Sequence, residues 1–287
     1  MVLGLGCATQ AASEADETTS TIQGVIHVER TATDDGATTS VSAKFLRILP
    51  SDSAAAERLV GTHVVLPSVG ECAQLSALQP DVTTSKLKGS VELVDVGDLT
   101  LLVQGAHFGG ESNLVPITLA PRAFPDVGDL ASGVFYTSPD ATRDLPSPAR
   151  FAIKGSGASF VEPFGIDVDG PAAPSNVRLN GHRFSDSPKV ESGRDITVEW
   201  DAASSDAAEL VYVEIHGETS FRCAFHDVGS ATVPSDVLSR GDATATLSLH
   251  RLREQDVRLQ LAERQGEETT TVQFDLARSG RFAIVGR

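Results

Sequence analysis

The chain has little positive charge and no long apolar stretch. Its 287 residues include 23 lysines and arginines against 39 aspartates and glutamates, which gives a net charge of −16. Nucleic acids and anionic lipid surfaces are therefore poor partners, because both would repel the chain. No apolar run approaches the roughly 18 residues that cross a bilayer, so the sequence predicts no membrane-spanning helix.

The chain also lacks the local motifs of common metal and catalytic sites. It has seven histidines and three cysteines, but no HxxxH, HExxH or CxxC spacing and no GxSxG turn. His226 and Asp227, which are adjacent in the chain, come closest to a pair of metal ligands. Adjacent strand positions point to opposite faces, so we interpret this pair as part of a turn. Motifs therefore predict no catalytic, cofactor-binding or metal-binding residue.

Three weaker matches are better explained by chance. Ser85 and Lys88 have the SxxK spacing, but they lie at a predicted strand edge without a KTG or SDN partner. Residues 155–160 begin like a GxGxxG loop and lack the third glycine. Residues 240–242 spell the cell-adhesion tripeptide RGD, which we interpret as a β-turn. None of the three predicts a function.

What the chain does have is alternation of apolar and polar residues with a period of two. Ile196, Val198 and Trp200 share one face of a predicted strand, and further alternating runs cover 211–215, 221–225, 247–249, 257–261 and 272–276. The first half contains short apolar runs bounded by glycine, proline, aspartate or serine. Helical periodicity is missing throughout. The predicted fold class is all-β, with two tandem antiparallel β-sandwich (Ig-like) domains after a flexible tether.

The predicted boundary between the two domains is the segment 160–181, FVEPFGIDVDGPAAPSNVRLNG, which we call the joint. Pro163, Pro171 and Pro174 interrupt any continuous strand ladder there. We therefore expect a tether over residues 1–20, a β-sandwich over 21–170 and an Ig-like or fibronectin-like sandwich over 171–287. Limited proteolysis is expected to cut before residue 20 and next near residues 169–176.

The N-terminal residues MVLGLGC are followed by a polar segment with nothing to bury. A small residue before Cys7, with leucines just upstream, is similar to the bacterial lipobox, in which the cysteine becomes an acylated N-terminus. The lipobox has a leucine three positions before the cysteine, where this chain has Gly4. The chain also lacks a basic region before this segment, as expected if the true start lies upstream. We expect lipid attachment at Cys7, with the membrane contacted only through this anchor. The alternative is an apolar N-terminus without a function.

Several segments together resemble the two-module lipoproteins that are common in myxobacteria. They are the lipobox-like start with its tether, FVEPFGIDVDGPAAP in the joint, and then DITVEW, SFRCAFHDVGSATVPSDVL and TLSLHR. The resemblance covers most of the chain and rests on spacing and composition. It implies a cell-envelope location and an Ig-like C-terminal domain, and it supplies neither an activity nor a site.

If Cys7 is lipidated, Cys72 and Cys223 remain, and an oxidising envelope would allow them to pair. They fall in different predicted domains, and a bridge needs Cα atoms within about 7 Å. The alternative, which the pattern favours, is that Cys223, between Phe221 and Phe225, is a small core residue on an inward face.

Asp167 and Asp169 lie at the joint, where tandem extracellular sandwiches can bind calcium. Two carboxylates on alternate strand positions face the same side, and calcium takes six to eight oxygens. These residues are therefore candidate calcium ligands. The alternative is that both simply solvate a strand end.

The sequence thus predicts a non-enzymatic cell-envelope lipoprotein that acts as a binding or structural module without a cofactor. Its protein or glycan partner is not identified by any motif. One alternative is a secreted hydrolase whose serine, histidine and aspartate come from separate loops, and another is a calcium-stiffened adhesion module. A concave site with a nucleophile and a base within hydrogen-bond reach would distinguish the hydrolase.

Overall fold

The computed structural model of the chain describes residues 21–48, 60–61, 63–78, 91–105, 115–124, 131–139, 145–159, 161–203, 210–238, 243–259 and 268–286. The lipid-attachment candidate Cys7 lies outside these ranges, as do the SxxK and RGD matches. No helix within the described ranges has the length and apolarity that crossing a membrane requires.

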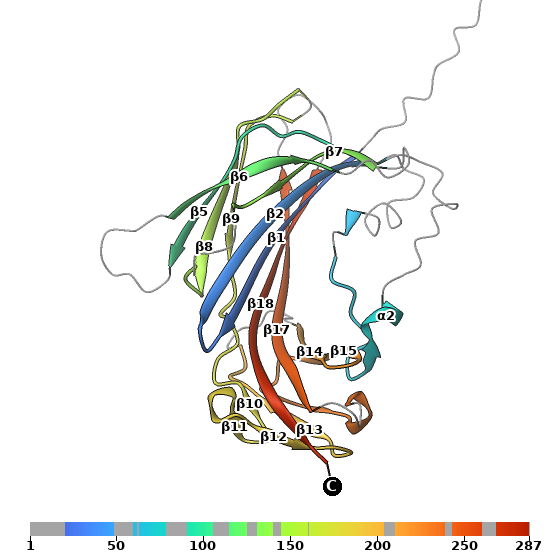
Figure 1. Cartoon of the computed structure of the whole chain (residues 1–287). Helices are drawn as coiled ribbons and strands as arrows, with labels where there is room; N and C mark the ends of the chain where they lie inside the picture. Colours follow the sequence, from blue (N-terminus) through green and yellow to red (C-terminus); the bar gives the residue numbers. More distant parts are fainter. Residues whose placement is uncertain are drawn as a thin grey trace, which may run out of the picture.

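The fold is all-β, as the alternation predicts (Figure 1). A mixed 14-stranded sheet has the order β3-β15-β14-β17-β18-β1-β2-β4-β7-β6-β5-β8-β9, with β12 paired to β18. Its strands are β1 (Thr21–Thr33), β2 (Gly36–Ile48), β3 (Cys72–Gln74), β4 (Val91–Leu93), β5 (Leu99–Gly105), β6 (Val115–Ala123), β7 (Ala131–Thr137), β8 (Ala149–Gly155), β9 (Phe164–Asp169), β12 (Lys189–Glu191), β14 (Leu210–His216), β15 (Ser220–His226), β17 (Thr244–Leu259) and β18 (Glu268–Val285).

A second, four-stranded sheet has the order β11-β10-β13-β16. Its strands are β10 (Arg178–Leu179), β11 (His182–Arg183), β13 (Ile196–Glu199) and β16 (Ser230–Val233). Helical structure in the described ranges includes the short elements α2 (Leu75–Leu78), η2 (Phe184–Asp186) and η3 (Ser235–Val237).

Strand β17 is longer than the sequence predicts. The segments around 247–249 and 257–261 read as two strands, whereas β17 runs without a break from Thr244 to Leu259. The polar residues between them suggest a turn, but Glu254 and Asp256 simply occupy the exposed face of a continuous strand. One long hairpin of β17 and β18 therefore replaces several short strands.

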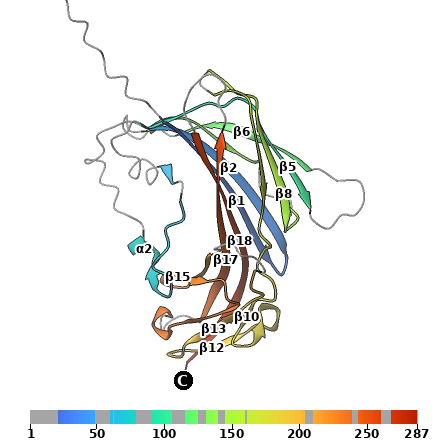
Figure 2. The ribbon, with the colours of Figure 1, turned by 180° about the vertical axis from the view of Figure 1, so that it is seen from behind.

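Strands β1 and β18 pair in parallel over ten residue pairs, from Gln23 opposite Thr269 to Ala32 opposite Arg278. Figures 1 and 2 both show these two strands side by side, although they come from opposite ends of the chain. The pairing joins strands from both predicted domains in one sheet. Whether the chain divides at residue 170 remains a prediction.

Two hydrophobic cores lie in tandem on one face of this sheet. The first core packs β5, β8 and β9 against β1, β2 and residues Val272, Phe274 and Leu276 of β18. The second core packs the four-stranded sheet against β14, β17 and residues Phe282 and Ile284 of β18. All five β18 residues occupy even-numbered positions, so they point to the same side. We call the opposite side of the long strands the back face.

Arg251 of β17 lies between the two cores and is only 2% exposed. Its Nε donates to Oδ2 of Asp227 at 2.7 Å, and its Nη2 donates to the carbonyl of Asp201 at 2.8 Å. Its Nη1 donates to the carbonyl of Ala172 in the joint at 2.7 Å. Asp227 also accepts a hydrogen bond from Nε1 of Trp200 at 2.5 Å. Through its hydrogen bond to Ala172, Arg251 links the joint to the hairpin of β17 and β18.

A second contact fastens the joint from the side of the first core. Ser147 Oγ donates to the carbonyl of Pro171 at 3.1 Å and accepts from the backbone N–H of Ala173 at 2.7 Å. Because both sides of the joint are held, its contacts favour resistance to proteolysis over the cleavage near residues 169–176 that the sequence predicts.

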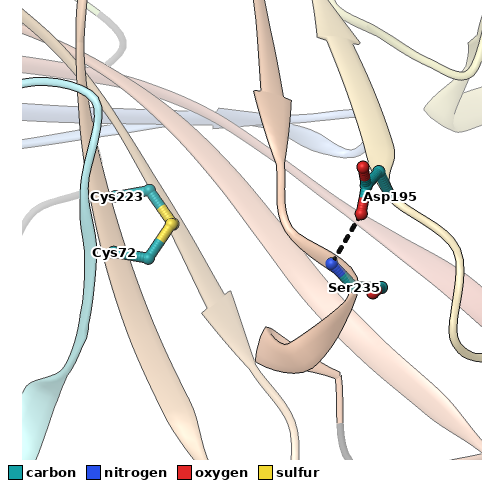
Figure 3. Close-up of a disulfide and its surroundings, with 4 residues drawn as sticks. All are labelled: Cys72, Asp195, Cys223 and Ser235. Carbon is teal, nitrogen blue, oxygen red and sulfur yellow. Dashed lines mark hydrogen bonds between the residues drawn. A yellow bond between two sulfur atoms is a disulfide. The ribbon is translucent and has the colours of Figure 1, made fainter.

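A disulfide joins Cys72 of β3 to Cys223 of β15, with an S–S distance of 2.05 Å (Figure 3). The two cysteines are directly opposite each other in an antiparallel pair. Cys223 is fully buried in the second core, as its position between two phenylalanines predicts, but its sulfur is not free. The sequence predicts that Cys72 belongs to the first domain, whereas β3 adds an edge strand to the sheet of the second core.

Figure 3 also shows the start of η3 beside this region. The backbone N–H of Ser235 donates to Oδ1 of Asp195 at 3.0 Å. The contact gives a partner to a backbone donor at the start of η3, where the short helix supplies none.

Candidate functional site

Polar side chains cross the back face from β15 to β1, through β14, β17 and β18. Strand pairing brings them together, because Arg222 is opposite Glu214, Tyr212 is opposite His250, and Asp275 is opposite Glu29. We call this set the polar row, which consists of Arg222, Glu214, Tyr212, His250, Asp275, His27 and Glu29. Sequence spacing gives little sign of the row, because its members come from five strands and only His27 with Glu29 and Tyr212 with Glu214 are two positions apart.

Asp275 is the centre of the polar row, and its side chain is 8% exposed. Its Oδ2 accepts a hydrogen bond from the Tyr212 hydroxyl at 2.5 Å, and its Oδ1 accepts one from Nδ1 of His250 at 2.8 Å. Burial by itself would raise the pKa of Asp275, but the hydrogen bonds from His250 and Tyr212 more than offset it, so the pKa is lowered. The carboxylate is therefore ionised.

Tyr212 is held on both faces of its ring. The ring stacks on His250 with centroids 4.2 Å apart, and the Arg222 guanidinium lies 5.1 Å from its centroid. Burial, and then the neighbouring charge of Asp275, raise the pKa of Tyr212 far above its ordinary value. The phenol therefore stays protonated and acts as a fixed hydrogen-bond donor.

At the β1 end of the polar row, one ligand atom each from His27, Glu29 and Asp275 lie within 4.8 Å of one another. Glu29 Oε1 is 3.7 Å from Nδ1 of His27, while its Oε2 accepts a hydrogen bond from Ser40 Oγ at 3.1 Å. One imidazole nitrogen and two carboxylates form a donor set that divalent transition metals accept. This group matches no local metal-site motif, although the sequence His27-Val28-Glu29 puts two donors on one strand face.

At the other end of the polar row, Ser220, His216 and Glu214 form a second arrangement. His216 Nδ1 lies 3.0 Å from Ser220 Oγ, and its Nε2 lies 2.9 Å from Oε2 of Glu214. The other carboxylate oxygen of Glu214 accepts from Nε of Arg222 at 2.9 Å and from its Nη2 at 2.5 Å. A hydroxyl, an imidazole and a carboxylate in this order are the parts of an activated nucleophile.

Glu214 is ionised in this arrangement. Burial would raise its pKa, but the hydrogen bond from Arg222 and the positive charges around it lower the pKa below the ordinary value. The carboxylate therefore fixes the orientation of His216 and Arg222 together. His216 remains 44% exposed, so the serine and the imidazole face water.

A hollow of about 410 Å³ lies beside Arg222 and Glu214. The segment 63–78 contributes the rest of its lining, namely His63, Val64, Val65, Leu75 and Leu78. Arg222 Nη1 donates to the carbonyl of Val65 at 2.6 Å, which attaches this segment to the sheet. The hollow combines an apolar wall with one cation and one carboxylate.

The calcium candidates Asp167 and Asp169 share the exposed face of β9, at the edge of the large sheet. Within the described ranges, they do not belong to a group of three possible metal ligands, so calcium binding there remains a prediction. Of the other sequence candidates, His226 is exposed at the end of β15, while Asp227 is the buried partner of Arg251.

No protein-family model matches the chain, and no curated protein matches it either. The candidate sites are therefore interpreted from their own geometry.

Proposed function

We propose that the protein is a non-enzymatic binding protein of the cell envelope, anchored by lipid at Cys7. The observation that supports a location in the cell envelope is the disulfide between Cys72 and Cys223, since disulfides persist outside the reducing cytosol. The polar segment after Cys7 supplies the tether. The net negative charge of the chain favours its solubility. We further propose that the chain forms two sandwich modules, 21–170 and 171–287, each around one of the two cores. The β17–β18 hairpin of the second module would contribute residues to both cores.

The hollow beside Arg222 supports a binding role over a purely structural one. Its volume of about 410 Å³ is within the range of small-ligand sites. Val64, Leu75 and Leu78 provide apolar contact, while Arg222 and Glu214 provide fixed charges that orient a ligand. Both charged side chains are largely buried and held by the contacts of the polar row, so the site is preorganised.

The lipid anchor is tested by replacing Cys7 with serine. We expect the unchanged protein, produced in its native host with an alkyne fatty acid, to incorporate the label and to sediment with membranes. The Cys7→Ser variant is expected to lose both properties, because no acyl chain remains to bind the bilayer. Cys72 and Cys223 remain in this variant, so loss of the label would show that the fatty acid was attached to Cys7 and not to another cysteine. An intact Met1 on the protein from its own host would contradict the anchor.

A hydrolase is the second candidate function, and the contact of His216 with Ser220 and Glu214 is the observation that favours it. Two features favour binding instead. Ser220 and His216 are direct cross-strand neighbours at a hairpin end, where a polar pair stabilises the sheet. The imidazole is exposed to water, whereas hydrolases enclose their reacting groups.

Ser220→Ala distinguishes the two functions. We expect the variant and the unchanged protein to show the same reaction with a fluorophosphonate probe and the same hydrolysis of p-nitrophenyl acetate. Ser230→Ala, which removes an exposed hydroxyl from β16, is the matched control. Labelling of Ser220, with hydrolysis that falls on the order of a hundredfold in Ser220→Ala and His216→Ala, would replace the binding proposal by the hydrolase.

A further inference from the structure

We propose that His27, Glu29 and Asp275 bind one divalent transition-metal ion of the zinc class on the back face. This inference is independent of the proposed function. It concerns the place where β1 and β18 pair in parallel, and not the hollow beside Arg222.

The strand pairing itself builds the donor set. His27 and Glu29 are two positions apart on β1, so both point to the back face. The parallel register puts Asp275 opposite Glu29. The three ligand atoms lie within 4.8 Å of one another, and zinc at about 2.0–2.2 Å from each requires spacings of roughly 3–3.5 Å. Glu29 is 55% exposed, so its side chain has room to move the short distance that closes this gap.

Buried polar atoms at the site point to a ligand. Nε2 of His27 is buried and has no hydrogen-bond partner among the described residues. Gln273, which is opposite His27 in the register and only 1% exposed, likewise has a buried Oε1 without a partner there. Buried polar atoms are normally paired, because leaving one unpaired costs about 1–3 kcal/mol. Coordination through Nε2 would give His27 the partner that this atom lacks.

The two carboxylates are already oriented by a second layer of hydrogen bonds. Tyr212 and His250 donate to the two oxygens of Asp275, and Ser40 donates to Oε2 of Glu29. Such partners hold metal ligands in place in established metal sites. Lys44 also contributes positive charge from β2, but its ammonium donates to the carbonyls of Val60 and Gly61. Tyr212, His250 and Ser40 are thus positioning residues.

The donor set selects the class of ion. Calcium and magnesium prefer oxygen ligands only, whereas an imidazole nitrogen beside two carboxylates suits zinc and its neighbours in the first transition row. Glu29 is solvent-exposed, which leaves a route for the ion to reach the site from solution.

The test uses the full chain without an affinity tag and with Cys7→Ser, so that no accessible thiol binds zinc. After treatment with EDTA, the protein is titrated with zinc chloride against a chromophoric chelator, and Co²⁺ absorption reports the coordination. We expect one equivalent of zinc, with affinity reduced by more than about 100-fold in Glu29→Gln and in His27→Ala, because loss of a ligand costs more than the roughly 10- to 100-fold that loss of an outer-shell partner costs. Asp167→Asn/Asp169→Asn, which removes two exposed carboxylates elsewhere on the sheet, is the matched control and is expected to bind as the parent does.

Glu29→Gln is the decisive variant, because the side chain is 55% exposed and we therefore expect the substitution to leave the fold intact. Binding of less than one equivalent of zinc by the parent would overturn the proposal. Unchanged affinity in both Glu29→Gln and His27→Ala would overturn it as well, since zinc would then bind elsewhere. Binding of Ca²⁺ in place of zinc would be a third contradicting result.

Discussion

Removal of the bridge between Cys72 and Cys223 is expected to lower the free energy of unfolding by about 5 kcal/mol. The bridge joins residues 151 positions apart, and the entropy that a closed loop of this size removes from the unfolded chain is worth roughly 5 kcal/mol. The bridge also holds β3, which is one of the shortest strands of the sheet, against β15. Its removal therefore weakens the attachment of this edge strand as well. Chemical denaturation of the Cys72→Ala/Cys223→Ala variant measures the loss of free energy.

Reduction of the unchanged protein provides the control. A thiol reductant is expected to lower the denaturation midpoint of the unchanged protein and to leave that of the double variant unchanged. Alkylation of the unfolded protein without reductant, followed by peptide mapping, tests the bridge directly. Modification of both Cys72 and Cys223 under these conditions would mean that they are free thiols and would contradict the prediction.

Arg251→Ala is expected to lower the free energy of unfolding by about 3–5 kcal/mol. The substitution leaves the Asp227 carboxylate buried without its counter-charge and leaves the carbonyls of Ala172 and Asp201 without their donor. It also releases the joint from the long hairpin. We therefore expect proteolysis near residues 169–176 to become faster in the variant, together with a lower midpoint in urea.

Arg253→Ala is the matched control for this prediction. Arg253 lies two positions further along β17 and donates to the carbonyl of Asp169 at 3.3 Å, but this contact is exposed. We expect its removal to cost less than about 1 kcal/mol. A double-mutant cycle of Arg251→Met with Asp227→Asn adds a second measurement, in which the paired change should cost less than the sum of the two single changes. A loss below 1 kcal/mol in Arg251→Ala would contradict the role of the buried ion pair.

The fold class could be predicted from the sequence, because alternation is a local property. Ile196, Val198 and Trp200 are buried on one side of β13 and its continuation, as their spacing predicts. Alternation does not reveal which strands pair. Nothing in the residues of β18 indicates that β1 is its neighbour, since the contact depends on the whole topology. The sequence also predicts separate strands at 247–249 and 257–261 where β17 is continuous, because the polar positions between them resemble a turn.

The candidate sites were harder to predict than the fold. Motif searches look for donors that are close in the chain, whereas Tyr212, His250 and Asp275 meet only through strand pairing. Asp227 illustrates the converse problem. Its sequence context is that of a turn between β15 and β16, and only the structure reveals that the turn brings its carboxylate to Arg251 and Trp200.

The parallel pairing of β1 with β18 has a consequence for how the chain reaches its native state. Gln23 pairs with Thr269, so the chain has to be synthesised as far as β18 before the central ladder can form. Contacts of such long sequence separation make folding slow, and β1 exposes an unpaired edge meanwhile. We expect folding of this ladder to follow synthesis of β18, with the intermediate prone to aggregation unless that edge is shielded.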